Sequence, residues 1–71
     1  MRVLAIDPAV RNTGYAIVEG HGRSAQALAF DVISIPDRLP QSAALAAVRM
    51  HLQHVIQKHQ PDEVAVEGII Y

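Results

Sequence analysis

The sequence predicts an α/β fold: a mixed sheet with a three-strand antiparallel meander, one crossover helix and a parallel fourth strand. Three observations support this prediction. A short continuous apolar run lies near the N-terminus, two alternating stretches follow it, and the second half of the chain changes to helical periodicity. With 71 residues, the chain is long enough for one small domain and no more.

The N-terminal half of the chain has the pattern of three consecutive strands. The first is predicted at residues 2–7, a continuous apolar run typical of a strand buried on both faces. It ends at Asp7 because Pro8 has no N–H group to donate to a neighbouring strand. Two alternating stretches, residues 14–19 and 26–35, follow on either side of a glycine-containing turn. Short turns between consecutive strands indicate antiparallel pairing.

The C-terminal half is predicted to form a helix and a last strand. Residues 41–59 have helical periodicity, with Ser42 as a candidate N-cap and Pro61 after the end. The apolar stripe expected to face the sheet consists of Leu45, Val48, Leu52, Val55 and Ile56. A strand is then predicted at residues 64–70. Since strands in α/β folds are commonly followed by another covering element, we expect the chain to be a truncated domain.

Composition excludes several classes of protein. The net charge of −1 gives no sign of the basic surface that nucleic-acid-binding proteins usually have. Without cysteine, the chain has no disulfide framework and no thiolate metal site. It has no segment that resembles a signal peptide and no apolar run near the roughly 20 residues of a membrane span. We therefore expect a cytoplasmic protein with no membrane partner.

Two acidic residues stand out because each lies in or at the end of an apolar strand. Asp7 ends the first strand, and Glu67 interrupts the last one. A right-handed crossover through the helix would place these strands side by side and parallel, with both acids toward the carboxyl end of the sheet. On the residues alone, a turn role for Asp7 and an edge position for Glu67 remain alternatives.

Paired carboxylates at one sheet edge indicate metal chemistry. Carboxylates about 4 Å apart repel by roughly 4 kcal/mol at an effective dielectric constant of 20, and a divalent cation turns this repulsion into attraction. Mg²⁺ is usually held by one or two carboxylates together with phosphate and water. The hypothesis from the residues is therefore metal-assisted phosphoryl chemistry at Asp7 and Glu67.

Two stretches of the sequence resemble the RuvC family. They are residues 6–19, Ile-Asp-Pro-Ala-Val-Arg-Asn-Thr-Gly-Tyr-Ala-Ile-Val-Glu, and residues 56–67, Ile-Gln-Lys-His-Gln-Pro-Asp-Glu-Val-Ala-Val-Glu. The resemblance covers essentially the whole chain, apart from a variable middle. It implies an RNase H-like fold, with residues 1–71 as the N-terminal portion of a single nuclease domain. Asp7 and Glu67 match two catalytic, metal-ligating acids of the family.

The resemblance also implies a function and its partners. The family consists of homodimeric endodeoxyribonucleases that cut four-way (Holliday) DNA junctions in recombination and repair, with Mg²⁺ or Mn²⁺ as cofactor, and that work with branch-migration helicases. Thr13 and Gly14 match the family's turn into the second strand, where the glycine is expected to allow close packing or an unusual backbone angle. The remaining two family acids are absent, so we expect the 71-residue chain alone to be inactive.

The predicted DNA contacts are Arg11, Ile70 and Tyr71. Arg11 follows Asp7 in a loop, where a role as a solvated side chain is the alternative. The family has an aromatic residue a few positions after its catalytic Glu, but the aligned residue here is Ile70, with Tyr71 next to it. The family also usually has glycine where this chain has Ala9. His51 and His54 share a helix face, but without a third placed ligand they predict no zinc site.

Three other interpretations of the sequence are alternatives to a RuvC-type nuclease. The actin-like ATPase and sugar-kinase fold also opens with a strand, an Asp and a turn, but it prefers a glycine-rich turn that can hold phosphate. The YqgF-type relatives share the RNase H-like fold and act on RNA, and they favour an arginine before the glycine. The non-enzyme alternative is a degenerate domain with a role in folding or assembly.

Overall fold

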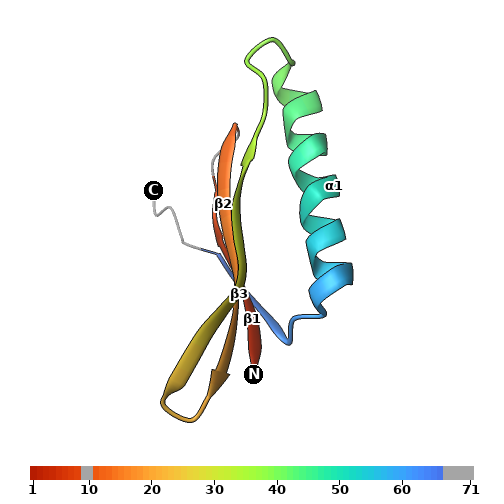
Figure 1. Cartoon of the computed structure of the whole chain (residues 1–71). Helices are drawn as coiled ribbons and strands as arrows, with labels where there is room; N and C mark the ends of the chain where they lie inside the picture. The colour runs from red at the N-terminus through yellow and green to blue at the C-terminus, as the bar shows by residue number, and fades with distance from the viewer. Residues whose placement is uncertain (9–10, 67–71) are drawn as a thin grey trace.

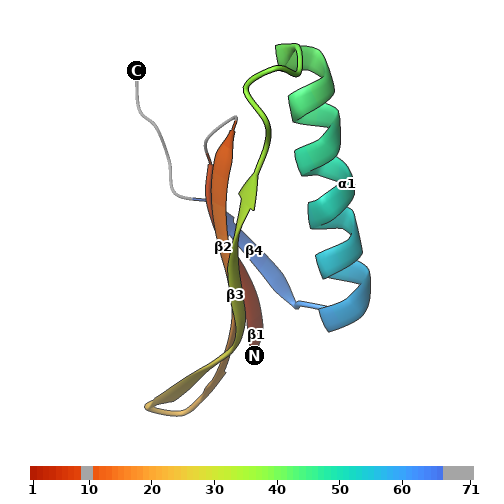
Figure 2. The same ribbon diagram turned by 45° about the horizontal axis from the view of Figure 1, so that its top comes forward.

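In the computed structural model, the elements follow the predicted order of three strands, a helix and a strand. The structure describes residues 1–8 and 11–66. The elements are β1 (Arg2–Asp7), β2 (Asn12–His21), β3 (Ser24–Ser34), α1 (Gln41–His59) and β4 (Glu63–Val66). The strands form one sheet in the order β3-β2-β1-β4, with α1 against one face (Figure 1). Figure 2 shows the same two layers in a turned view.

The antiparallel meander is confirmed, but β2 and β3 are longer than predicted. Both strands extend into the segment expected to be a turn, so that His21 and Ser24 pair with each other. The loop then holds only Gly22 and Arg23. A two-residue hairpin loop requires a positive φ angle, and Gly22 supplies it with φ of 60° at no steric cost.

The parallel pairing of β4 with β1 is also confirmed. Leu4 pairs with Val64, and Ile6 pairs with Val66. The chain crosses from β3 at one edge of the sheet to β4 at the other through α1, which allows β4 to lie parallel to β1. Of the predicted strand at residues 64–70, the part after Val66 lies outside the described residues.

The helix has the predicted bounds, because a proline stands just outside each end. Pro40 is the N-cap residue with ψ of 153°, an extended conformation, and no side chain caps the first turn. The prediction of Ser42 as N-cap is therefore wrong, since the helix begins one residue before it. At the other end Gln60 is left-handed with φ of 50°, and its N–H donates to the carbonyl of Ile56 at 2.8 Å.

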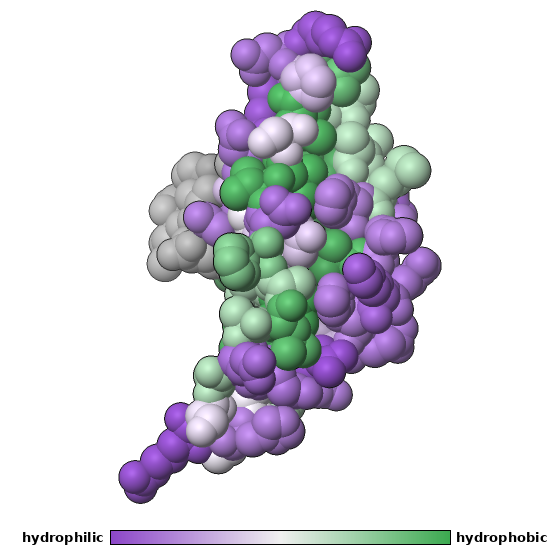
Figure 3. Space-filling view, viewed as in Figure 1, coloured by the Kyte–Doolittle hydropathy of each residue, from purple (hydrophilic) through white to green (hydrophobic). Residues whose placement is uncertain are grey.

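The core lies between the sheet and α1, where Leu4, Ile17 and Val55 are buried together. The predicted stripe is confirmed for Val55, which is buried, and for Val48 and Leu52, which are half-buried, but not for Leu45 and Ile56. Ala44 is fully buried, whereas Leu45 is 51% exposed and Ile56 39% exposed. Near the N-terminal end of α1, the buried residue is thus a small alanine and not Leu45. In Figure 3 hydrophobic residues gather in the middle of the view, and the hairpin tip is hydrophilic. Within the described residues, no helix has the length and apolar character to cross a membrane.

The face of the sheet opposite α1 carries large apolar side chains that are open to solvent. Leu28, Phe30 and Val32 alternate with the core-facing residues of β3, and Phe30 is 78% exposed. Ile33, the neighbour of Val32, is buried on the other face. The helix therefore covers one of two apolar faces, as is expected for part of a two-sided α/β domain.

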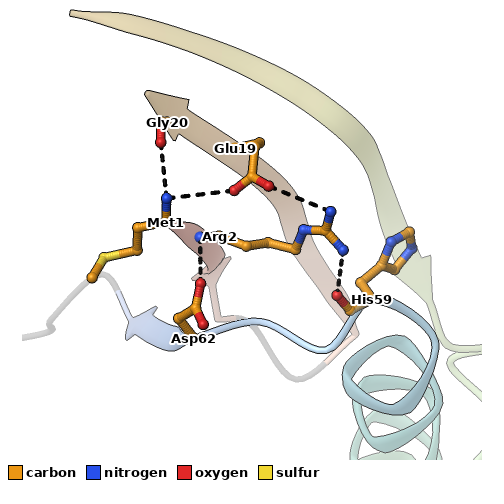
Figure 4. Close-up of polar contacts among 6 residues, drawn as sticks. All are labelled: Met1, Arg2, Glu19, Gly20, His59 and Asp62. Atoms are coloured by element: carbon orange, nitrogen blue, oxygen red, sulfur yellow. Dashed lines mark hydrogen bonds and ion pairs between the residues drawn. The ribbon is translucent and has the colours of Figure 1, made fainter. Parts of the chain in front are cut away.

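Arg2 ties together three elements at the end of the sheet opposite Asp7 (Figure 4). Its Nη1 donates to the carbonyl oxygen of His59 at 2.7 Å, in the last turn of α1, and its Nη2 donates to Glu19 Oε1 at 3.4 Å. Its backbone N–H donates to Asp62 Oδ2 at 2.8 Å, just before β4. A cation at the helix C-terminus also complements the helix dipole. These contacts fix where the helix ends and β4 begins.

We expect Arg2→Met to lower the free energy of unfolding by about 1–2 kcal/mol, because it removes charge-assisted hydrogen bonds but keeps the aliphatic stem. The loss is partly offset because Arg2 Nε is buried and has no partner in the described part of the chain. Denaturant unfolding measures the change, with Arg49→Met on the exposed side of α1 as the matched control. Equal stability of the two variants would contradict a structural role for Arg2.

Candidate metal centre at the end of strand β1

Asp7 is the last residue of β1, and its side chain is exposed. It pairs with Gly14 of β2. Among residues 1–8 and 11–66, no hydrogen bond or ion pair to its carboxylate is present, so a turn-stabilising role receives no support from these contacts. An exposed carboxylate with free lone pairs can ligate a cation.

Gly14 leaves open the space beside this carboxylate. A Cβ atom on Gly14 would lie 3.9 Å from Asp7 Cβ, an ordinary van der Waals distance, and the backbone angle of Gly14 is not in the positive-φ region. The expectation of an unusual backbone angle is therefore wrong. A methyl group at position 14 would make ordinary contact with the Asp7 side chain. Thr13, before it, is buried on the other face of the sheet.

A shallow apolar groove reaches Asp7 across three strands. Its lining consists of Ala5, Ile6, Asp7, Gly14, Tyr15, Ala16, Ala65 and Val66. Among the described residues that line the groove, Asp7 is the single charged one. The groove therefore presents one carboxylate at the edge of an otherwise apolar surface.

Glu67, the second predicted ligand, lies outside the described residues, as do Ile70, Tyr71 and Ala9. The structure does describe how β4 leads toward it. Val66 pairs with Ile6, and in the sequence Glu67 follows Val66 as Asp7 follows Ile6. Within the described ranges, no group of three or more His, Asp or Glu residues is arranged to hold a metal ion.

Arg11 is held by the chain itself rather than extended into solvent. Its Nη1 donates to the carbonyl oxygen of Pro36 and its Nη2 to that of Leu39, both at 2.7 Å. These contacts bind the loop before α1 to the segment that follows Asp7. Sequence reasoning missed this role, because no feature of the sequence marks Pro36 and Leu39 as carbonyl acceptors.

The histidines of α1 do not lie at the Asp7 groove. His51 packs against Tyr15, with ring centroids 5.9 Å apart and planes tilted by 56°. His51 and His54 line a separate shallow depression on the helix surface. Tyr15 therefore contributes to packing between β2 and α1.

Comparisons with known proteins agree with the resemblance. A family model described as crossover junction endodeoxyribonuclease RuvC matches residues 3–71. RuvC of Akkermansia muciniphila is 58% identical over 71 residues, which are the whole of this chain and 42% of that protein. RuvC of Thermomicrobium roseum is 39% identical over 71 residues, or 43% of its length. The chain thus spans less than half the length of these relatives.

Solved structures support the same fold. T. thermophilus RuvC in complex with a Holliday junction substrate matches with a TM-score of 0.88 and 26% identity, over 100% of this chain and 46% of that one. A second T. thermophilus RuvC structure also gives a TM-score of 0.88, with 27% identity and 45% coverage of that chain. The predicted RNase H-like fold class is confirmed. These matches favour the nuclease prediction over the sugar-kinase and YqgF alternatives.

Proposed function

The chain belongs to the RuvC family of crossover junction endodeoxyribonucleases, and from that premise we propose that it forms part of a metal-dependent nuclease that resolves four-way DNA junctions. In this proposal residues 1–71 are the N-terminal portion of a single RNase H-like domain. Asp7 and Glu67 are two of its catalytic metal ligands. The homodimer, the branch-migration helicase partner and the cytoplasmic location belong to the same proposal.

One observation carries the assignment of the site. Within the described residues, the last pair in the parallel register of β1 and β4 is Ile6 with Val66, and an acid follows each of these residues in the sequence. Asp7 is exposed, and within the described residues no donor occupies its carboxylate. Two acids that follow register partners are a suitable source of ligands for one shared cation.

The donor set fits a hard divalent cation. Carboxylate oxygens suit Mg²⁺ and Mn²⁺, and Mg²⁺ accepts a site with two protein ligands when phosphate and water complete its coordination. A bound metal supplies charge stabilisation at a phosphodiester and lowers the pKa of a metal-bound water. The chain's own contribution is to hold two carboxylates at one sheet edge.

The DNA contacts follow from this arrangement. The T. thermophilus relative was solved with a Holliday junction substrate, and we propose branched DNA as the substrate class here. Ile70 and Tyr71 follow Glu67 in the sequence and remain predicted DNA contacts. Arg11 is better described as a structural residue, because both of its terminal nitrogens already donate to backbone carbonyls.

A titration of Mn²⁺ and Mg²⁺ followed by thermal melting tests the proposal. A cation bound to the folded chain at about 100 times its dissociation constant stabilises it by roughly 2.7 kcal/mol. We expect the melting temperature to rise with either metal but not with K⁺ at matched ionic strength. The rise should disappear in Glu67→Gln. A shift that Glu67→Gln retains would contradict the proposed site.

A further inference from the structure

The loop between β3 and α1 is fastened to the segment that follows Asp7. The N–H of Ile35 donates to the carbonyl oxygen of Arg11 at 2.9 Å, and the guanidinium of Arg11 donates to the carbonyls of Pro36 and Leu39. A third bond, from Leu39 N–H to Pro36 O at 3.2 Å, closes the loop on itself. A planar guanidinium with two terminal donors can bridge two carbonyls in one fixed geometry, which an ammonium cannot.

These hydrogen bonds hold the loop between β3 and α1 at the end of the sheet that carries Asp7. Asp7 lies at the carboxyl end of β1, and Asn12, at the start of β2, pairs with Ser34 near the end of β3. In Figure 1 the loop and the start of α1 lie at that same end. The backbones of Asp7 and of the end of β3 are two strand spacings apart, or about 10 Å, and Arg38 lies beyond the end of β3 in the chain. The phosphates of one DNA duplex crossing this edge span such a distance easily.

Arg38 stands in this loop with its side chain exposed. Within residues 1–8 and 11–66, it takes part in no ion pair or side-chain hydrogen bond. Arg2 and Arg11 differ from it, because their guanidinium groups are engaged by the chain itself. Arg38 is thus a cation at the Asp7 end that is available to an external anion, in a loop whose position is fixed.

We infer that Arg38 contacts a phosphate of the DNA and that Arg11 is the positioning residue that holds its loop in place. The inference rests on the proposed function, since it assumes that DNA passes the Asp7 end of the sheet. It reassigns the predicted contact from Arg11 to Arg38. It also explains how a chain of net charge −1 can offer a phosphate contact beside a carboxylate site.

The salt dependence of DNA binding tests the role of Arg38. Binding of the 71-residue chain to a fluorescent four-way junction is measured by anisotropy over a KCl series at constant Mg²⁺. The slope of log K against log salt is negative, and loss of one phosphate contact reduces its magnitude by about 0.9. We expect this decrease in Arg38→Ala, for a junction and for a plain duplex alike. Arg49→Ala, which removes an exposed arginine from the body of α1, should leave the slope unchanged.

A double substitution tests the positioning role of Arg11. Arg11→Lys keeps the charge but bridges the two carbonyls poorly, so the loop that carries Arg38 is no longer held in place. We therefore expect the magnitude of the salt slope to fall by about 0.9, as in Arg38→Ala. Because Arg11 acts through Arg38, the double variant should bind no more weakly than Arg38→Ala alone. A melting curve of Arg11→Lys confirms that the variant is folded. If Arg11 were itself the phosphate contact, lysine would preserve the slope, which would overturn the inference.

The outcomes separate this inference from the proposed function. A slope that Arg38→Ala leaves unchanged overturns the inference. So does an absence of salt-dependent DNA binding by the unsubstituted chain. Neither result alters the metal titration, in which Asp7 and Glu67 are tested without DNA.

Discussion

Asp7→Asn is expected to abolish the metal-induced rise in melting temperature, a loss of about 2.7 kcal/mol of stabilisation at a metal concentration near 100 times the dissociation constant. Asparagine keeps the size of the side chain but removes its charge, so it cannot neutralise a divalent cation. The metal-free variant should be as stable as the parent chain or more stable. Asp7 is exposed, and in the proposed site its charge is repelled by Glu67 until a cation binds.

The control for this substitution is Asp37→Asn, which makes the same chemical change in an exposed loop at the same end of the sheet. We expect Asp37→Asn to retain the full metal response. Thermal melts of both variants, with and without Mn²⁺, give the comparison. A large loss of stability in metal-free Asp7→Asn would instead identify Asp7 as a structural turn residue.

Leu4→Ala should cost about 3 kcal/mol of unfolding free energy, within the usual range of about 2–5 kcal/mol for buried leucines. Leu4 is fully buried on β1 and packs with Ile17 and Val55 at the centre of the core. Native domains are stable by only about 0.05–0.15 kcal/mol per residue. In a chain of 71 residues, one cavity therefore removes a large part of the total stability.

Leu28→Ala provides the matched control, since it makes the same change on a strand at a position that is 42% exposed. Its cost should be less than about 1 kcal/mol, because it leaves no cavity. Urea unfolding of both variants measures the difference. Equal costs would mean that the sheet face opposite α1 is packed as tightly as the core.

Much of the fold could be predicted because local signals coincide with its boundaries. Pro8 marks the end of β1, and Pro40 and Pro61 bracket α1, so these limits follow from the missing N–H group of proline. The ends of β2 and β3 could not be predicted in the same way. The polar residues around Gly22 are typical of a longer turn. The pairing of His21 in β2 with Ser24 in β3 shows that the loop has two residues.

The predicted buried stripe of α1 was wrong at Leu45 and Ile56 for a related reason, although Val55 is buried as predicted. Periodicity identifies a helix, but it favours large apolar side chains such as Leu45 as the buried ones. The packing instead buries Ala44, because a short side chain lets the helix lie close to the sheet. Which residues lie at the contact depends on the distance between the two layers, and that distance is a tertiary property.

The candidate site was predictable in part. The position of Asp7 at the end of β1 could be predicted, because Pro8 cannot continue the strand, and its role as a metal ligand remains a prediction. The environment of Arg11 could not, since its two acceptors are backbone carbonyls some 25 and 28 residues away in the chain. Any residue type provides such acceptors, so the sequence carries no mark of them. Glu67 remains a prediction from the sequence and the family.

The parallel pairing of β1 with β4 has a consequence for the order of folding. This contact joins residues about 60 positions apart, for example Arg2 and Asp62, whereas β2 and β3 meet across a two-residue loop. Closing a long loop loses more chain entropy than closing a hairpin, so the hairpin should form early and the β1–β4 pair late. If Asp7 and Glu67 share a cation as proposed, the two ligands come together only when β1 and β4 pair, so a chain without this pair would not hold the ion.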